Sequence, residues 1–224
     1  MNTVVDVHLE AEEIHMLAKP TAPRAALFDF DGTIAETEAL SMALVAKVLR
    51  SYGIEPTKEE LDGMVGNDDA VTVPPILARA TKPIAFDDYL RDLDDCRETY
   101  YRTPLVPFDG VVAFIEGLRE RGVACAIVSS TSAFNVVMAL DRLGMVHLFD
   151  AIVCGDMVGH LKPEPDVYLR ALEVLGVEAG ECIAYEDSPS GIAAAHAAGI
   201  YTVAFTGSVV VQDRSSADET IDRW

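Results

Sequence analysis

The chain has 224 residues, half of them apolar, and its 17 Lys and Arg face 37 Asp and Glu, for a formal net charge of −20. A chain of this length can bury one sizeable core and still carry a second small unit. So negative a charge disfavours nucleic acid and anionic membrane as partners, because both carry phosphate charges that repel it. An anionic substrate must therefore meet a local positive site, most simply a metal ion.

Residues 1–20 hold a short amphipathic stretch, HLEAEEIHMLAK (8–19), which KPTAP ends. We interpret residues 1–20 as an N-terminal extension to the core. No basic patch precedes an apolar core here, so a signal peptide is not indicated, and no window of the chain is apolar for long enough to span a membrane. The four cysteines show no CxxC spacing, so we expect neither a disulfide framework nor a zinc site. Cytoplasmic localisation and a monomer are the expectations.

The first expected strand is the apolar run LFDFDGTIAE (27–36), which ends in two carboxylates, Asp29 and Asp31. A buried strand that presents two acids at its tip is costly unless something balances them. Residues 37–107 follow, with helical patterns and no convincing strand, and they are too long for a crossover helix. We interpret 37–107 as an inserted helical domain and residues 21–36 and 108–224 as the α/β core.

The second half of the chain repeats one pattern: amphipathic helix, glycine, apolar strand, polar tip. The four expected strands lie in VACAIVSS (123–130), FDAIVCGD (149–156), ECIAYED (181–187) and IYTVAFTG (200–207). Each helix is followed by a glycine, where a helix end favours a left-handed residue: Gly122, Gly144, Gly176 and Gly199. Continuous apolar strands indicate a parallel sheet covered by helices on both faces. With the first strand, the pattern predicts a doubly wound, mainly parallel, Rossmann-like α/β core of about five strands.

In such sheets the ligand binds beyond the carboxyl ends of the strands. Polar residues stand at these ends and are expected to converge on one rim: Asp29, Asp31, Ser129, Ser130, Asp156, Glu186 and Asp187. Four acids in one cleft raise each other's pKa values, and a hard divalent cation such as Mg²⁺ resolves the repulsion. Lys162 lies in a nearby proline-stiffened loop. A lysine and a metal beside carboxylates fit phosphoryl transfer, in which one carboxylate attacks phosphorus and a second transfers protons.

Four motifs, in this order and spacing, resemble those of the haloacid dehalogenase superfamily, in the branch with a small helical cap after the first strand. They are DFDGT (29–33), Ser129, KPEPD (162–166) and EDSPSG (186–191), and the resemblance covers residues 25–205. It implies Asp29 as nucleophile and Asp31 as general acid and base. It also implies phosphate binding by Ser129, Ser130 and Lys162. Magnesium would be held by Asp29, the Asp31 carbonyl and Asp187, with Glu186 in or just outside the ligand shell.

Branches of this superfamily differ at a few positions, and the residues found there in this sequence discriminate between them. Haloacid dehalogenases lack the second aspartate, and phosphonate hydrolases use a cap lysine instead, so Asp31 favours phosphate-ester chemistry. The alternative is a mutase like β-phosphoglucomutase, whose pattern has a histidine at Ser41 and a cap arginine near Asp69. Residues 66–69, expected to face the rim, offer acids and no cation. We therefore favour a Mg²⁺-dependent phosphatase of a small phosphorylated metabolite, a sugar phosphate first of all.

Other kinds of site are disfavoured. There is no GxSxG elbow for a Ser–His–Asp hydrolase, and no glycine loop of the GxGxxG or GxxxxGK[ST] type for a nucleotide. Thr131 and Ser132 are expected to cap the helix that follows them, and Ser188 and Ser190 the helix after EDSPSG. A non-catalytic binding protein on the same fold is disfavoured because the catalytic set is complete.

Overall fold

The fold is known from a computed structural model that describes residues 17–64, 69–101 and 104–224. Most of the N-terminal amphipathic stretch, and residues 66–68 of the segment expected to face the rim, lie outside the described residues. The core is a six-stranded sheet, parallel throughout, in the order β3-β2-β1-β4-β5-β6. The strands are β1 (Ala25–Phe28), β2 (Ala124–Ser129), β3 (Ala151–Cys154), β4 (Cys182–Glu186), β5 (Tyr201–Phe205) and β6 (Glu219–Ile221). The prediction of a doubly wound α/β fold is confirmed.

The strand β6 was not predicted. It pairs in parallel with β5, with Glu219 beside Val203. Its three residues, Glu-Thr-Ile, are too few and too polar to form the apolar run by which the other strands were found. Pairing with β5 alone makes it a strand.

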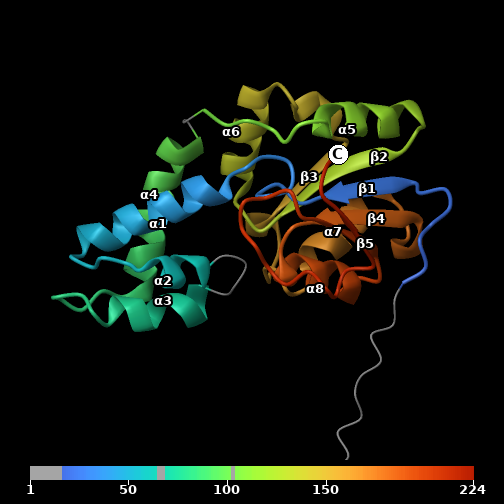
Figure 1. Ribbon diagram of the computed structural model, residues 1–224. Coiled ribbons are helices and arrows are strands. Elements are labelled where there is room, and N and C mark those ends of the chain that lie inside the picture. Colours follow the sequence, from blue (N-terminus) through green and yellow to red (C-terminus); the bar gives the residue numbers. More distant parts are fainter. Residues whose placement is uncertain (1–16, 65–68, 102–103) are drawn as a thin grey trace, which may run out of the picture.

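Helices cover both faces of the sheet, as the continuous apolar strands indicated. One pair lies on one face and the other pair on the opposite face (Figure 1): α5 (Val111–Glu120) with α6 (Ala133–Leu143), and α7 (Asp166–Leu175) with α8 (Pro189–Ala197). Alternate residues of β1 supply both layers, since Ala26 and Phe28 pack with α5 and α6 whereas Ala25 and Leu27 pack with α7 and α8. Every residue of this strand is buried, so it cannot alternate between apolar and polar.

The helices of this core end as predicted. α6 and α7 stop at Gly144 and Gly176, whose φ angles of +69° and +65° are left-handed. A residue with a Cβ is strained in this conformation, so glycine there ends the helix and turns the chain toward the next strand.

Between β1 and α5 the described residues form four helices, which we call the inserted helices: α1 (Glu38–Ser51), α2 (Lys58–Asp62), α3 (Asp69–Leu77) and α4 (Phe86–Tyr101). They have an apolar cluster of their own, in which Leu49, Val73 and Tyr89 are fully buried. They stand beside the sheet, on the side toward which β1 points (Figure 1), and α4 contacts α6. Three short 3₁₀ helices complete the described elements: η1 (Val146–Leu148), η2 (Gly155–Met157) and η3 (Ala179–Glu181).

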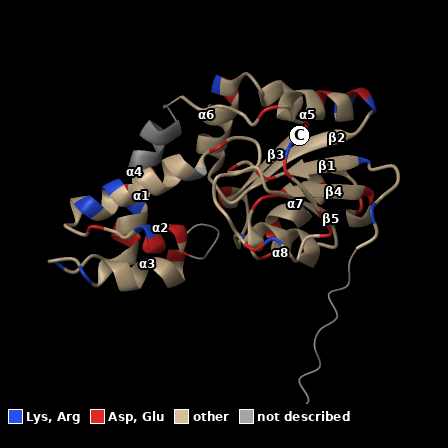
Figure 2. Cartoon of the chain, in the orientation of Figure 1, with Lys and Arg blue, Asp and Glu red and all other residues tan. Residues whose placement is uncertain are grey.

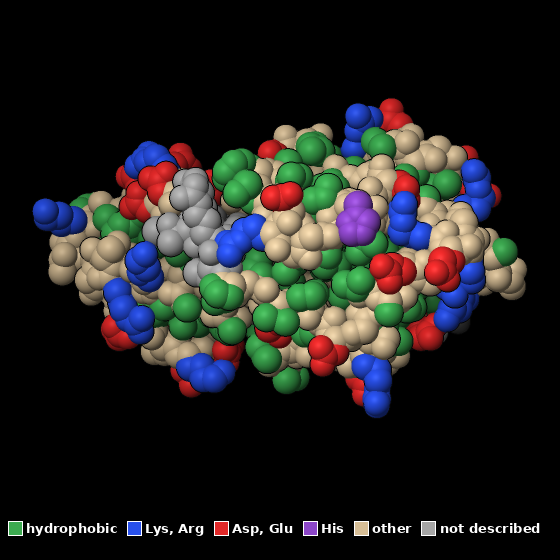
Figure 3. Space-filling view, turned by 90° about the horizontal axis from the view of Figure 1, so that it is seen from above, with side chains coloured by type: hydrophobic (Ala, Val, Ile, Leu, Met, Phe, Trp, Pro, Cys, Tyr) green, Lys and Arg blue, Asp and Glu red, His purple; other side chains and the backbone are tan. Residues whose placement is uncertain are grey.

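The composition raised questions about surface charge, membrane-spanning segments and cysteines, which the structure addresses in turn. Around the edge of the face seen from above, Lys and Arg lie among Asp and Glu, and hydrophobic side chains occupy much of the middle (Figure 3). In the described part of the chain no helix combines the length and the hydropathy needed to cross a bilayer. Among the described side chains, Cys125, Cys154 and Cys182 are buried with free thiols.

Candidate active site

The site lies where three neighbouring strands end. β1 lies between β2 and β4, so the residues that follow these strands are brought together at one edge of the sheet. Asp29 comes directly after β1, and its N–H donates to the carbonyl of Tyr185 in β4 at 2.9 Å. Ser129 is the last residue of β2, and Glu186 is the last of β4. Acidic segments at the strand ends are visible on the side that faces the inserted helices (Figure 2).

Three buried carboxylates form the centre of the site. Asp29, Glu186 and Asp187 each offer an oxygen, and these oxygens lie within 4.8 Å of one another. Glu186 is fully buried, and Asp187 and Asp29 are only 2% and 7% exposed. Hard oxygen donors in so small a space are the ligands that a divalent cation such as Mg²⁺ or Ca²⁺ prefers. The donor set therefore fits a cation.

Two glycines allow the backbone to approach these carboxylates. A Cβ on Gly32, which has a φ of +76°, would lie 2.2 Å from Asp187 Oδ2, and a Cβ on Gly191 would lie 2.0 Å from Glu186 Oε2. Both positions therefore exclude any larger residue unless the carboxylates move.

Lys162 lies between two of the carboxylates. Its Nζ donates to Asp29 Oδ1 at 2.6 Å, to Glu186 Oε1 at 2.5 Å and to the carbonyl of Val128 at 2.9 Å. Burial acts to lower the pKa of Lys162, but the charges of Asp29 and Glu186 outweigh it and raise this pKa above the ordinary value. Lys162 is therefore a fixed ammonium ion with all three hydrogens engaged.

Glu186 is held by neighbours on both oxygens. The Tyr168 hydroxyl donates to Oε1 at 2.6 Å, the same oxygen that accepts from Lys162, and Ser188 Oγ lies 3.4 Å from Oε2. Burial, and then the Glu186 charge, raise the pKa of Tyr168 well above its usual value, so the phenol stays protonated and donates. These contacts favour a role for Glu186 in holding Lys162. No sequence pattern singled out Tyr168, which looks like any residue on the apolar face of α7.

Asp29 shows why the site needs a further positive charge. Burial raises the pKa of its carboxyl well above the usual value; Lys162 opposes this rise, whereas the charges of Glu186 and Asp31 add to it. A cation bound beside Asp29 would favour the ionised form. The raised pKa of Asp29 and the three carboxylate donors thus both favour a bound divalent cation.

Asp31 is partly exposed and lies near enough for its charge to act on the Asp29 carboxyl. Its Oδ2 accepts a hydrogen bond of 2.7 Å from Thr131 Oγ1. The expectation that Thr131 caps α6 is therefore wrong, because its hydroxyl is turned toward the site. Within the described residues the Ser132 side chain does not cap α6 either; instead Asp156 Oδ1 accepts from the N–H of Ala133 at 2.9 Å. Asp156 stabilises the start of α6 by this bond.

The two serines after β2 differ in their surroundings. Ser129 is buried, and its Oγ accepts from the Thr131 N–H at 3.0 Å, which leaves the hydroxyl hydrogen available to a ligand. Ser130 is partly exposed, and its carbonyl lies so close to Gly155 that a Cβ there would come within 2.3 Å. Phosphate binding by both serines stays a prediction. Ser188 caps α8 as predicted, since its Oγ accepts from Gly191 N–H at 3.1 Å.

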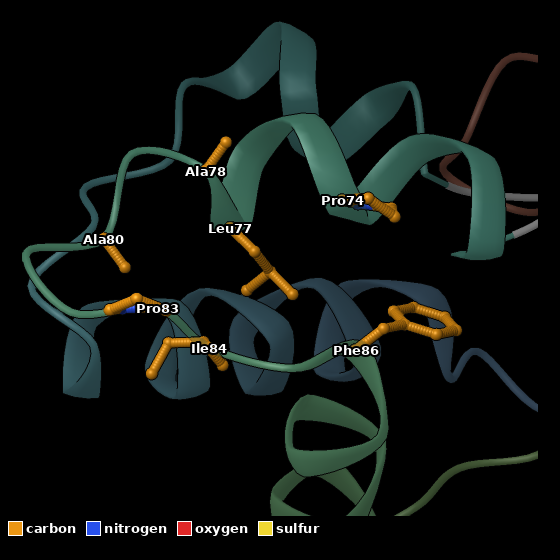
Figure 4. Close-up of a pocket in the computed structure, with 7 residues that line it drawn as sticks. All are labelled: Pro74, Leu77, Ala78, Ala80, Pro83, Ile84 and Phe86. Carbon is orange, nitrogen blue, oxygen red and sulfur yellow. The ribbon is translucent and has the colours of Figure 1, made fainter.

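A separate hollow of about 430 Å³ lies on the inserted helices (Figure 4). Its lining comes from residues 74–86 and is apolar, with Pro74, Leu77 and Phe86 among the side chains drawn. It offers no ionisable group, so the carboxylate cluster is the better candidate for chemistry.

Comparisons with known proteins show which family this chain resembles in sequence and in fold. The family described as haloacid dehalogenase-like hydrolase matches residues 26–205. The fructose-1-phosphate phosphatase YqaB of Escherichia coli is 33% identical over 79% of this chain and 93% of that protein. The phosphorylated carbohydrates phosphatase of Thermotoga maritima is 28% identical over 79% of this chain and 82% of its own length. Among solved structures, CbbY from Rhodobacter sphaeroides in complex with phosphate gives a TM-score of 0.75 at 27% identity, over 90% of this chain and 94% of that one.

Proposed function

We propose that this chain, which belongs to the haloacid dehalogenase-like hydrolase family, is a Mg²⁺-dependent phosphatase that hydrolyses a small sugar phosphate through an aspartyl phosphate on Asp29. The observation that carries the proposal is the buried Asp29 carboxylate, held by Lys162 within 4.8 Å of two further acids, with Asp31 two residues along the chain. The relatives named as phosphatases of phosphorylated carbohydrates and of fructose 1-phosphate support the substrate class.

In the first step, an oxygen of Asp29 attacks phosphorus and the bond from phosphorus to the sugar oxygen breaks. Asp31, in its protonated form, gives its proton to the departing oxygen, so the sugar leaves as a neutral alcohol. Thr131 orients Asp31 for this transfer through its 2.7 Å bond to Oδ2.

In the second step, Asp31 accepts a proton from a water molecule, and the resulting hydroxide attacks phosphorus of the aspartyl phosphate. The Asp29–phosphorus bond breaks, inorganic phosphate leaves, and both aspartates return to their starting forms. Lys162 offsets negative charge with its ammonium group, and Ser129 donates its free hydroxyl hydrogen to a phosphoryl oxygen.

The residues that would hold Mg²⁺ are Asp29, Asp187 and the backbone carbonyl of Asp31. When bound, the ion neutralises charge that develops on the phosphoryl oxygens. Glu186 then serves mainly to hold Lys162, which accounts for its bonds to Lys162 and Tyr168.

We further propose that residues 37–107 act as a cap over the rim, that 21–36 and 108–224 form the catalytic core, and that 1–20 are an extension. A cap limits the access of water during the first step and selects the substrate. The monomeric state, the cytoplasmic location and the lack of nucleic-acid and membrane partners stay predictions. Nothing in the described residues favours the mutase alternative.

The experiment combines turnover with detection of the intermediate. The protein is assayed on p-nitrophenyl phosphate and a panel of sugar phosphates, with Mg²⁺ and with a chelator. The variant Asp31→Asn is then mixed with substrate, quenched in acid and reduced with borohydride, which converts an aspartyl phosphate to homoserine. Peptide mass spectrometry is expected to find homoserine at position 29.

The control is Asp222→Asn, which changes an exposed carboxylate paired with Arg223 and is expected to keep full turnover. Turnover that persists without a divalent cation, or a modified residue other than Asp29, would contradict the proposal. Conversion of glucose 1-phosphate to glucose 6-phosphate without release of phosphate would establish the mutase instead.

A further inference from the structure

We infer that Arg214 is a positioning residue that holds Asp187 in the geometry needed to bind the cation, from a loop that also bonds to the linker before the inserted helices. The inference rests on the proposed function, because it concerns the cation that the phosphatase requires. Its basis is a set of contacts made by the loop after β5, residues 206–214.

Arg214 is buried beside Asp187. Only 6% of its side chain is exposed, and its Nε donates to the backbone carbonyl of Asp187. Its Nη2 donates to the carbonyl of Val210 at 3.1 Å and lies 3.9 Å from Asp187 Oδ2. Arginine is almost never buried unless it is paired. Here two of the partners belong to Asp187, a proposed metal ligand: its backbone carbonyl and its carboxylate.

Asp187 is thus fixed from two sides. The backbone at Gly32 lies against its carboxylate, in a position where even a Cβ would come within 2.2 Å of Oδ2. Arg214 holds the carbonyl of the same residue. Together these contacts set both the backbone orientation and the direction of the carboxylate. Residues that orient metal ligands in this way are often worth 10- to 100-fold in metal affinity.

The same loop reaches the linker that leads to the inserted helices. The Val210 carbonyl accepts a hydrogen bond from Arg214. The N–H of the preceding residue, Val209, donates to Glu36 Oε2 at 3.0 Å. Glu36 stands two residues before α1 begins. Hydrogen bonds therefore connect Asp187 with Arg214, Arg214 with Val210, and the neighbouring Val209 with Glu36. The loop is a direct connection between the proposed cation site and the start of the inserted helices.

Neither the motifs nor the family match predicts this arrangement. The matched region ends at residue 205, so Arg214 lies outside it. It also stands in an irregular segment, where no periodicity assigns a direction to a side chain. The contact is therefore visible only in the tertiary structure.

Two effects of Arg214 on cation binding oppose each other. Its positive charge competes with a cation for Asp187, so removing the charge alone would strengthen binding. Its hydrogen bond orients Asp187, so removing the bond would weaken binding. The separation of 3.9 Å from Oδ2 is too long for a hydrogen bond, whereas the carbonyl contact is a direct one. We therefore expect loss of orientation to decide the sign.

The test measures Mg²⁺ binding by isothermal titration calorimetry, with MgCl₂ as the titrant and no substrate present. Arg214→Lys keeps the charge but loses the planar fork, and Arg214→Met loses both. Both variants are expected to bind Mg²⁺ at least about tenfold more weakly than the unmodified protein. The matched control is Arg223→Lys, at an exposed arginine, with unchanged affinity expected.

Circular dichroism establishes that each variant is folded before titration. A folded Arg214→Lys protein that binds Mg²⁺ within twofold of the unmodified protein would overturn the inference, as would tighter binding by Arg214→Met. If the unmodified protein binds no Mg²⁺, the proposed function itself fails. If the unmodified protein binds Mg²⁺ and the Arg214 variants bind it with the same affinity, the proposed function stands and this inference alone fails.

A measurement on the unmodified protein covers the case in which the variants do not fold. Hydrogen exchange is followed by mass spectrometry with and without Mg²⁺. Amides of residues 206–214 are expected to gain protection together with those around Asp187. Protection confined to the strand ends, with no change in 206–214, would overturn the inference.

Discussion

Charged residues behave differently at the strand ends and in the inserted helices. At the strand ends, Asp29, Lys162 and Glu186 are buried and bonded to one another. In the inserted helices, the ion pairs Lys58–Asp62 and Arg79–Glu60 are at the surface, and the buried cluster is apolar. Exposed pairs contribute roughly 0–1 kcal/mol each, whereas breaking a buried pair leaves an uncompensated charge.

The two regions should therefore differ in the substitutions that they tolerate. The loss of a single polar group at the strand ends should lower activity strongly, because the buried side chains there hold one another in place by hydrogen bonds. The same change in the inserted helices should leave the chemistry intact. Matched substitutions in the two regions test this difference.

The largest effect is expected from Asp29→Asn, which replaces the proposed nucleophile by an amide of the same shape. Turnover of p-nitrophenyl phosphate should fall by several powers of ten, because an amide cannot form the acyl phosphate. The matched variant is Asp62→Asn, at the exposed partner of Lys58 in α2, and its turnover should stay within about twofold. Retention of more than about one per cent of activity by Asp29→Asn would remove Asp29 from the nucleophile's role.

The next effect is expected from Gly32→Ala, which places a Cβ 2.2 Å from Asp187 Oδ2. Asp187 must move, so Mg²⁺ affinity measured by calorimetry should fall by about tenfold or more. Gly122→Ala is the matched control, since Gly122 has nearly the same φ, +77° against +76°, with nothing within 4 Å of the added carbon. Gly122→Ala should lose about 1–2 kcal/mol of stability from backbone strain and keep its Mg²⁺ affinity. Equal affinity losses in the two variants would mean that strain, and not the contact with Asp187, is responsible.

A smaller effect is expected from Tyr168→Phe, which removes one hydroxyl from Glu186 and leaves the ring. A lost hydrogen bond of about 1 kcal/mol corresponds to roughly a fivefold fall in kcat/KM, through a less firmly held Lys162. Tyr52→Phe removes a comparable hydroxyl, bonded to Asp92 at 2.6 Å within the inserted helices. It should leave kcat/KM unchanged. If both variants lose activity alike, Tyr168 has no special relation to the site.

The smallest effect on turnover is expected from Leu49→Ala, although its effect on stability is large. Leu49 is fully buried in the apolar cluster of the inserted helices, so the cavity should cost about 2–5 kcal/mol, measured by denaturant unfolding. Mg²⁺ affinity of the folded protein should stay within twofold, because none of the proposed ligands lies in this cluster. Leu140→Ala removes the same side-chain atoms from a fully buried leucine of α6, and it serves as the size-matched control. Weaker Mg²⁺ binding by folded Leu49→Ala would show that the inserted helices support the cation site.

The fold class and the acidic residues of the site can be predicted from local sequence patterns. Continuous apolar strands, amphipathic helices and glycines at helix ends suffice to predict a parallel α/β sheet, because these patterns are local and repeat. The rule that ligands bind beyond strand ends then brings Asp29, Glu186 and Asp187 together, and the structure finds these three in one cluster. The roles assigned to these residues stay predictions until the variants are measured.

Which other side chains face the site depends on contacts between distant parts of the chain. The Lys162–Asp29 bond spans 133 residues, Arg214 reaches Asp187 across 27, and Thr131 reaches Asp31 across 100. No local pattern encodes such a contact, since it depends on how strands and loops are packed side by side. From the sequence we expected Thr131 to cap a helix, and no pattern assigned a role to Arg214. Packing alone turned both toward the carboxylates.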